Sequence, residues 1–161
     1  MRGLFILALS LLSLNTFAAG SKIDIPKYDW SWKGFFGTYD RASAQRGLKV
    51  YREVCAGCHS MDLIAYRNLA DLGFSEAHIK AIAAEYLVPD GPNDEGEMFE
   101  REAIPSDRFA NPYPNVQAAR AANNGAYPPD LSLIVKARPK GADYLKALLL
   151  GYIEAPADKE V

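Results

Sequence analysis

The stretch VCAGCHS, residues 54–60, largely decides how this chain of 161 residues is interpreted. It contains the only two cysteines of the sequence, Cys55 and Cys58, and one of its two histidines, His59. Two cysteines three positions apart cannot build the disulfide framework of a small secreted domain. The pattern C-x-x-C-H therefore indicates a chemical role for these three side chains.

Three kinds of site use cysteines at this spacing. A redox-active dithiol of the thioredoxin type needs strands that alternate with helices, and the sequence shows almost no strand pattern. A zinc site needs four ligands, which His78 could complete, but the adjacent Cys58 and His59 are poorly placed to hold one tetrahedral ion. Covalent attachment of haem c gives each residue of the motif a task. We therefore favour one covalent haem c, with the dithiol and the zinc site as alternatives.

The haem hypothesis assigns the three side chains directly. Cys55 and Cys58 lie one helical turn apart, so their thiols can meet the two vinyl groups of a porphyrin and form thioethers. The imidazole of the next residue, His59, then becomes the proximal ligand of the iron. His59 is thus the predicted metal ligand.

The beginning of the chain predicts export. Arg2 precedes an apolar run, residues 4–14, that is far shorter than the roughly 20 residues needed to span a bilayer. Small residues at 16 and 18 complete the pattern of a cleavable signal peptide, for which we predict residues 1–18. An uncleaved anchor or a buried helix is the alternative. The remaining residues 19–161 are long enough for one compact domain, and export suits haem c, which is attached outside the cytoplasm.

The charge of the chain argues against nucleic acid as a partner. The formal net charge is −2, and no basic run is present. The segment 90–102 contains six acidic residues and one basic residue, Arg101. Such a segment is either a solvated loop or a docking surface for a basic protein.

Apolar periodicity and capping residues predict an all-α fold with long ordered loops around the attached haem. The first helix carries the motif at its C-terminal end, with Leu48, Tyr51, Val54 and Cys55 on one apolar face. Residues 90–111 are predicted as a long loop, because they are rich in Gly, Pro, Asn and mixed charge. The expected helices are 39–54, 61–70, 76–87 (capped by Ser75), 115–122 (capped by Asn115), 131–137 (capped by Asp130) and 141–153.

Longer segments resemble a known family. They are WSWKGFFGTYDRASAQRGLKVYREVCAGCHSMDLIAYRNL (residues 30–69), DGPNDEGEMF (90–99) and NPYPNVQAARAANNGAYPPDLSLIVKAR (111–138). They are similar to the cytochrome c1 family, which supplies the haem-bearing subunit of respiratory bc1 complexes. The segment AARAANNGAYPPDLS is far more specific than the haem motif alone. The resemblance covers nearly the whole chain after the signal peptide.

The resemblance implies further cofactor-binding residues. Asn123, Ala126 and Pro129 match positions that line the haem pocket of the family. Arg138 matches an arginine that pairs with a haem propionate, a partner that suits the bidentate guanidinium. Tyr144 matches a tyrosine that contacts the haem.

The resemblance also implies a function and partners. The family member passes one electron from the Rieske iron–sulfur protein to a soluble cytochrome c, and it is bound to cytochrome b at the periplasmic face of the inner membrane. The acidic segment 90–102 would then be the docking surface for the soluble cytochrome c. The alternative is another periplasmic haem protein whose open distal site binds a peroxide or a small gas.

The second axial ligand of the iron is not identified within this sequence. The family uses a methionine that lies beyond residue 161, and a membrane anchor helix follows it. We expect neither Met61 nor Met98 to replace that methionine, and we expect His78 to be an exposed helix residue. The sequence is thus interpreted as a cytochrome c1-like domain truncated at its C-terminus.

Overall fold

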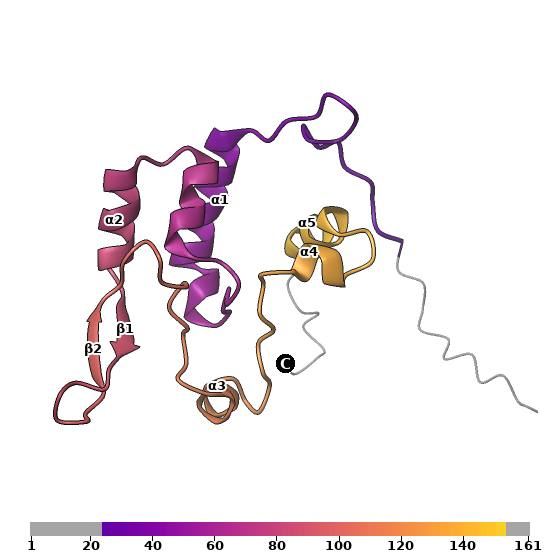
Figure 1. Cartoon of the computed structure of the whole chain (residues 1–161). Coiled ribbons are helices and arrows are strands. Elements are labelled where there is room, and N and C mark those ends of the chain that lie inside the picture. Colours follow the sequence, from indigo (N-terminus) through magenta and orange to yellow (C-terminus); the bar gives the residue numbers. More distant parts are fainter. Residues whose placement is uncertain (1–23, 154–161) are drawn as a thin grey trace, which may run out of the picture.

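The fold was analysed in a computed structural model that describes residues 24–153. The predicted signal peptide, residues 1–18, lies outside these residues. Figure 1 shows two neighbouring helical regions, one around α1 and α2 and one around α4 and α5, with α3 between their lower ends. The elements are α1 (Arg41–Glu53), η1 (Cys55–Gly57), η2 (Tyr66–Leu72), α2 (Glu76–Ala84), β1 (Leu87–Asp90), β2 (Phe99–Glu102), α3 (Val116–Ala122), α4 (Ile134–Ala137) and α5 (Ala142–Leu150).

Helix α1 forms where the sequence predicted it. The side chain of Asp40 caps its first turn by accepting a hydrogen bond from the Ser43 N–H, 3.2 Å away. Leu48 and Tyr51 pack against the hydrophobic core, as their helical spacing indicated. Val54 was wrongly placed on this face and is 70% exposed. The helix ends at Glu53, so Val54 leaves the helical register that would have turned it inward.

The hydrophobic core joins η2, α2 and the segment that follows the hairpin. Its buried members are Tyr66, Leu69, Ile79, Ala83, Ala103 and Phe109. Ser75 caps α2 through its hydroxyl, as predicted, and His78 is exposed on that helix. The helix predicted for residues 61–70 is wrong in its bounds, because the chain first makes an irregular turn and then a 3₁₀ helix over Tyr66–Leu72.

The fold is helical but not all-α. The predicted loop 90–111 contains β2, which pairs antiparallel with β1 and places Leu87 opposite Glu102. Pro89 lies in β1, and α2 stops at Ala84 instead of residue 87. The hairpin is stabilised by Arg101, which bridges the carboxylates of Asp90 and Asp107. Ionic contacts of this kind leave no hydrophobic alternation in the sequence, so the strands were missed.

Helix α3 begins as predicted, capped by the Asn115 side chain. Two expectations for the helices after α3 are wrong. Helix α4 begins at Ile134 after Leu133, so Asp130 does not cap it, and α5 ends at Leu150 instead of residue 153. None of the helices in residues 24–153 combines the length and apolar character needed to cross a bilayer.

The N-terminal segment reaches across to α5 (Figure 1). The carboxylate of Asp143, buried in α5, accepts hydrogen bonds from the Trp30 indole N–H at 2.6 Å and the Tyr28 backbone N–H at 3.2 Å. Lys33 forms an ion pair with the same carboxylate at 3.6 Å. The hydrogen bond from Trp30 lowers the pKa of Asp143 most. The Tyr28 and Lys33 contacts lower it further, and the three contacts together outweigh the desolvation, which raises it. This contact fixes the start of the chain beside its last helix.

Candidate functional site

Cys55 begins a single 3₁₀ turn after α1, and Cys58 directly follows that turn. The backbone N–H groups of Cys58 and His59 both donate to the Cys55 carbonyl, at 3.1 and 2.8 Å. This turn directs the chain away from the helix and leaves His59 at the start of the next segment. Both thiols are free, with Cys55 half-buried and Cys58 exposed.

His59 is held by a segment 70 positions away. Its ring Nδ1 lies 2.8 Å from the backbone carbonyl oxygen of Pro129. A carbonyl can only accept, so Nδ1 carries the proton in this contact. In the neutral imidazole, Nε2 then keeps its lone pair, which is the form that coordinates a metal ion. The structure thus brings together two predicted site residues, His59 and Pro129, and leaves the lone pair of Nε2 available.

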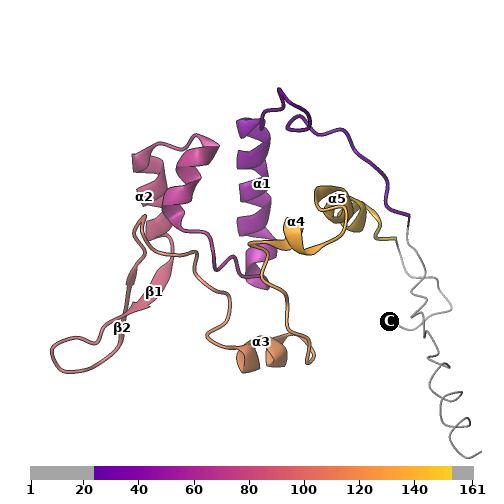
Figure 2. The same cartoon turned by 45° about the vertical axis from the view of Figure 1, so that its right-hand side comes forward.

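The contact between His59 and Pro129 belongs to a larger set of hydrogen bonds that we call the Asp130 clasp. The clasp joins residues 59–63, which follow the motif, to residues 129–132, which precede α4; Figure 2 shows the latter passing the end of α1. Its five bonds are His59 Nδ1 to Pro129 O (2.8 Å), Leu131 N to Ser60 O (2.9 Å), Ser60 Oγ to Asp130 Oδ2 (2.9 Å), Asp62 N to Asp130 Oδ2 (2.7 Å) and Leu63 N to Ser132 Oγ (3.0 Å).

The carboxylate of Asp130 is ionised within this clasp. Desolvation by burial raises its pKa, but hydrogen bonds from the Asp62 backbone and from Ser132 and Ser60 outweigh the desolvation and lower the pKa overall. An ionised carboxylate accepts such bonds more strongly than a neutral side chain does. The clasp is therefore a charge-assisted junction between the two segments.

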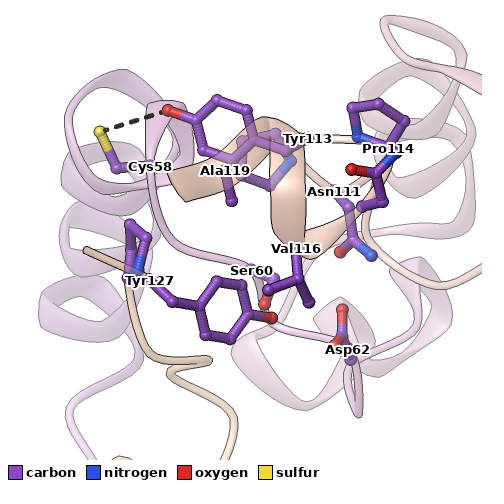
Figure 3. A pocket seen from close by; sticks show the side chains of 12 residues that line it. Cys58, Ser60, Asp62, Asn111, Tyr113, Pro114, Val116, Ala119 and Tyr127 are labelled. Atoms are coloured by element: carbon purple, nitrogen blue, oxygen red, sulfur yellow. Dashed lines mark hydrogen bonds between the residues drawn. The ribbon is translucent and has the colours of Figure 1, made fainter. Parts of the chain in front are cut away.

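A small cavity of about 130 Å³ opens beside Cys58. Figure 3 shows the ring of Tyr113 in its wall, with the hydroxyl directed at the Cys58 sulfur, 4.0 Å away. The side-chain amide of Asn123 donates to the Tyr113 hydroxyl at 3.2 Å and to the Ala119 carbonyl at 2.7 Å. Asn123 is thereby connected to the motif through Tyr113.

The end of α3 explains why Asn123 and Ala126 occupy a tight turn. Asn124 and Gly125 both adopt positive φ, at 51° and 86°, a conformation that glycine and asparagine tolerate best. The Gly125 N–H donates to the Arg120 carbonyl at 2.8 Å, and the Ala126 N–H donates to the Asn123 carbonyl at 2.9 Å. Ala126 is exposed, and its placement at a cofactor stays a prediction.

Arg138 and Tyr144 are not brought to the motif by any hydrogen bond among the described residues. Arg138 follows α4 and is exposed, and within residues 24–153 it forms no ion pair. Tyr144 lies on α5 in an apolar groove of about 600 Å³ that the segment Asp24–Tyr28 shares. Their contacts with a haem therefore stay predictions from the family resemblance.

Met61 and Met98, which were not expected to bind the iron, lie in different surroundings. Met61 packs beside the hydrophobic core, and Met98 is 66% exposed in the hairpin loop.

Tyr51 supports the backbone of His59. Its hydroxyl donates to the His59 carbonyl at 3.2 Å, and burial is the main reason that the pKa of Tyr51 rises to about 12. Tyr51 therefore stays protonated and braces the backbone of His59 from the core side.

The donor set fits a covalently bound haem better than the alternatives. Two free thiols at the end of a helix, followed by an imidazole with an available Nε2, are what haem c requires. Within residues 24–153, no three His, Cys, Asp or Glu side chains gather to hold a metal ion, which argues against the zinc site. The described sheet consists of one short hairpin, which is not the strand–helix alternation of a thioredoxin-like fold.

Two residues with roles at the site were missed or misread in the sequence. Tyr113 was not singled out, and its only signal was its position in the segment NPYPN, which carries no chemistry by itself. Asp130 was read as a helix cap. Besides the Ser132 N–H in its own turn, Asp130 contacts residues 60 and 62, and no local pattern reveals partners 70 and 68 positions away.

Comparison with known proteins places this arrangement in a family. The Cytochrome C1 family model matches residues 30–161. "Cytochrome c1 1, heme protein, mitochondrial" of Arabidopsis thaliana is 54% identical over 151 residues, which cover 91% of this chain and 49% of the relative. "Cytochrome c1" of Rhodospirillum rubrum is 55% identical over 130 residues, covering 81% and 48%. "Cytochrome b-c1 complex catalytic subunit, mitochondrial" of Candida albicans is 52% identical over 139 residues, covering 86% and 48%.

The fold and the donor set define the class, that of proteins with a C-x-x-C-H motif at a helix end and a histidine oriented by a distant carbonyl. Within this class, the chain belongs to the cytochrome c1 family. It spans about half the length of the curated relatives that it matches.

Proposed function

We propose that this chain is the electron-transfer haem c subunit of a respiratory bc1 complex, and that it passes one electron from a Rieske iron–sulfur protein to a soluble cytochrome c. The observation that supports the proposal most strongly is the hydrogen bond between His59 Nδ1 and the Pro129 carbonyl, beside two free thiols. It leaves Nε2 available as a ligand at the place where the motif would attach a haem. Membership of the cytochrome c1 family supplies the reaction class.

The residues of the chain would divide the work of holding the cofactor. The thiols of Cys55 and Cys58 would each add across a vinyl group, sulfur bonding to one carbon and the hydrogen to the other, without net oxidation. His59 would coordinate the iron through Nε2, and Asn123, Ala126 and Pro129 would line the pocket. Arg138 would pair with a propionate and Tyr144 would contact the porphyrin. When bound, the haem supplies one-electron chemistry through its ferrous and ferric iron.

The hairpin supports the proposed docking surface. Of the six acidic residues in segment 90–102, Asp90 is neutralised by Arg101. The other five are exposed and lie on one projecting hairpin and its loop (Figure 1): Asp94, Glu95, Glu97, Glu100 and Glu102. A concentration of negative charge on a projecting element raises the encounter rate with a basic partner at low salt.

The remaining assignments follow from the same proposal. Residues 1–18 would be a signal peptide and residues 19–161 a haem domain at the periplasmic face of the inner membrane. Cytochrome b and the Rieske protein would be its neighbours, which agrees with the relative named as part of a cytochrome b-c1 complex. The chain would be a redox subunit rather than an enzyme by itself.

Rapid mixing tests the electron-transfer role. The haem-loaded protein, reduced with ascorbate, is mixed with a basic ferric cytochrome c, and the absorbance change is followed at rising ionic strength. The proposal expects fast oxidation whose rate falls steeply with salt. A variant with Glu95→Gln, Glu97→Gln and Glu100→Gln should transfer electrons more slowly at low salt and show a weaker salt dependence. A second variant with Glu76→Gln and Glu85→Gln removes two acidic charges on and beside α2, and it tests whether a loss of surface charge outside the hairpin has a similar effect.

The rate of electron transfer separates this function from the rival class. A peroxidase-like or gas-binding protein would transfer electrons slowly to cytochrome c at every salt concentration. That result, or equal effects of the two sets of charge variants, would contradict the proposed acceptor and its docking surface.

A further inference from the structure

We propose that Asp130 is a positioning residue: it fixes the Pro129 carbonyl against His59 and so sets the strength with which His59 Nε2 binds iron. This inference rests on the proposed function, because it concerns the ligand histidine. It goes beyond that function in assigning a role to a carboxylate that neither the motif nor the family resemblance singled out.

One carboxylate bonds to both segments that meet at His59. Asp130 Oδ2 accepts from the Ser60 hydroxyl at 2.9 Å and from the Asp62 N–H at 2.7 Å, just after the histidine. Asp130 Oδ1 accepts from the Ser132 N–H at 2.8 Å, within its own segment. A single side chain therefore connects the chain around His59 with the chain around Pro129, beside the Leu131–Ser60 and Leu63–Ser132 bonds of the clasp.

Rigid backbone units transmit the position of Asp130 to the acceptor of His59. The Pro129 carbonyl and the Asp130 nitrogen belong to the same planar peptide unit, so a displacement of Asp130 moves the acceptor oxygen directly. Pro128 and Pro129 have φ fixed by their rings, which prevents the segment from absorbing the displacement by rotation about φ. The Leu131 N–H, bonded to the Ser60 carbonyl at 2.9 Å, holds the other side of Asp130.

A simple structural role would look different. A helix cap would bond to the first turn of α4, but that helix begins at Ile134 after Leu133. A solvated turn residue would bond only within its own turn. Asp130 instead uses one oxygen for its own turn and the other for residues 68 and 70 positions away.

The consequence concerns the imidazole. A ring N–H that donates to a well-placed acceptor makes the opposite nitrogen a stronger base, and a more basic ligand stabilises the ferric state of iron. If Asp130 is lost, the Pro129 carbonyl drifts from Nδ1, Nε2 becomes a weaker donor, and the reduction potential rises. Exchange of the Nδ1 proton with water also becomes faster, because its acceptor is no longer held.

The test compares two isosteric substitutions in the haem-loaded protein. Asp130→Asn preserves shape but cannot accept on both sides, because its NH₂ group faces either the Ser60 and Asp62 donors or the Ser132 N–H. Asp107→Asn is the matched control: Asp107 also uses its carboxylate to hold a loop, through the Ile104 N–H at 2.8 Å, and has no bond to residues 59–63. The readouts are the reduction potential and the solvent exchange of the His59 Nδ1 proton by NMR.

The proposal expects Asp130→Asn to raise the potential and to speed Nδ1 exchange about tenfold, the change expected for the loss of one hydrogen bond, while Asp107→Asn changes neither. If Asp130→Asn does not accumulate, Ser60→Ala removes one bond of the clasp and should shift both readouts in the same direction by less. Equal readouts for the Asp130 and Asp107 variants overturn the positioning role and leave the proposed function intact. Absence of covalent haem from the wild-type protein overturns both.

Discussion

Residues 61–110 and residues 111–153 are held in place by different forces. The first region contains the six buried apolar residues of the core, which join η2, α2 and the segment after the hairpin. In the second region the buried residues are Ala119 and Asp143, one small and one charged. Several large apolar side chains of the second region are exposed, including Leu133 at 51% and Val135 at 50%.

The second region is instead attached by polar contacts. The Asp130 clasp joins it to the haem motif, and Asp143 joins it to the N-terminal segment. Individual hydrogen bonds contribute about 1 kcal/mol each, whereas burial of one large apolar side chain contributes about 1.5–3 kcal/mol. The core therefore provides most of the stability of the fold, and the clasp determines where the second region lies relative to His59.

The largest expected effect concerns the core. Tyr66 is 2% exposed and packs against Phe109, with ring centroids 4.8 Å apart. Tyr66→Ala should lower the free energy of unfolding by about 3–5 kcal/mol, through lost burial and the cavity that remains. Urea denaturation followed by circular dichroism measures the loss. Leu149→Ala, at a side chain that is 69% exposed, is the control and should change stability by less than about 0.5 kcal/mol.

Two helix caps, one in each region, should each contribute an intermediate amount to stability. Ser75 caps α2 in the first region, and Asn115 caps α3 in the second. Substitution of either residue by alanine removes one cap, which is worth about 1 kcal/mol. We expect Ser75→Ala to lower global stability, and Asn115→Ala to accelerate amide exchange mainly within α3, because the second region can open without disrupting the core.

Hydrogen exchange by mass spectrometry distinguishes these outcomes for the two cap variants. If Asn115→Ala accelerated exchange equally in α2 and α3, the two regions would unfold as one unit and the comparison would fail.

The smallest expected effect is a pH dependence at the hairpin. The Arg101 guanidinium holds the pKa of Asp107 below its usual value, mainly through a side-chain hydrogen bond. A depressed folded-state pKa stabilises the protein above the unfolded value, which is about 3.9, and this contribution is lost as pH falls through the folded value. Because the pair is partly exposed to solvent, we expect less than about 1 kcal/mol.

Urea denaturation at several values between about pH 5 and pH 3 checks this sign. Stability should fall toward low pH in the wild-type protein and fall less in Asp107→Asn. A steeper loss in the variant would contradict the assignment.

The sequence was informative where contacts are local. The caps Ser75 and Asn115 act within three residues of their own position, and each was identified correctly. The C-x-x-C-H motif is local as well, so the sequence alone allowed haem attachment to be predicted at these residues. The family resemblance was predicted for nearly the whole chain after the signal peptide, and the family model confirmed it over residues 30–161.

The sequence was uninformative where ionised side chains join different segments. The β hairpin depends on Arg101 bridging Asp90 and Asp107, and charged residues next to a proline gave no strand signal. The role of Asp130 depends on residues 60 and 62, so its short-range context suggested only a cap. Both errors have one physical cause: an ionised side chain with a distant partner looks the same in sequence as a solvated one.

The mass of one peptide tests directly whether Cys55 and Cys58 carry a covalent haem. The chain is expressed in a periplasm with haem-attachment machinery, denatured, reduced, alkylated and cut with trypsin, which releases residues 53–67 between Arg52 and Arg67. We predict that this peptide carries one haem, with Cys55 and Cys58 both protected from alkylation. The same peptide with two alkylated cysteines and no haem would contradict the account.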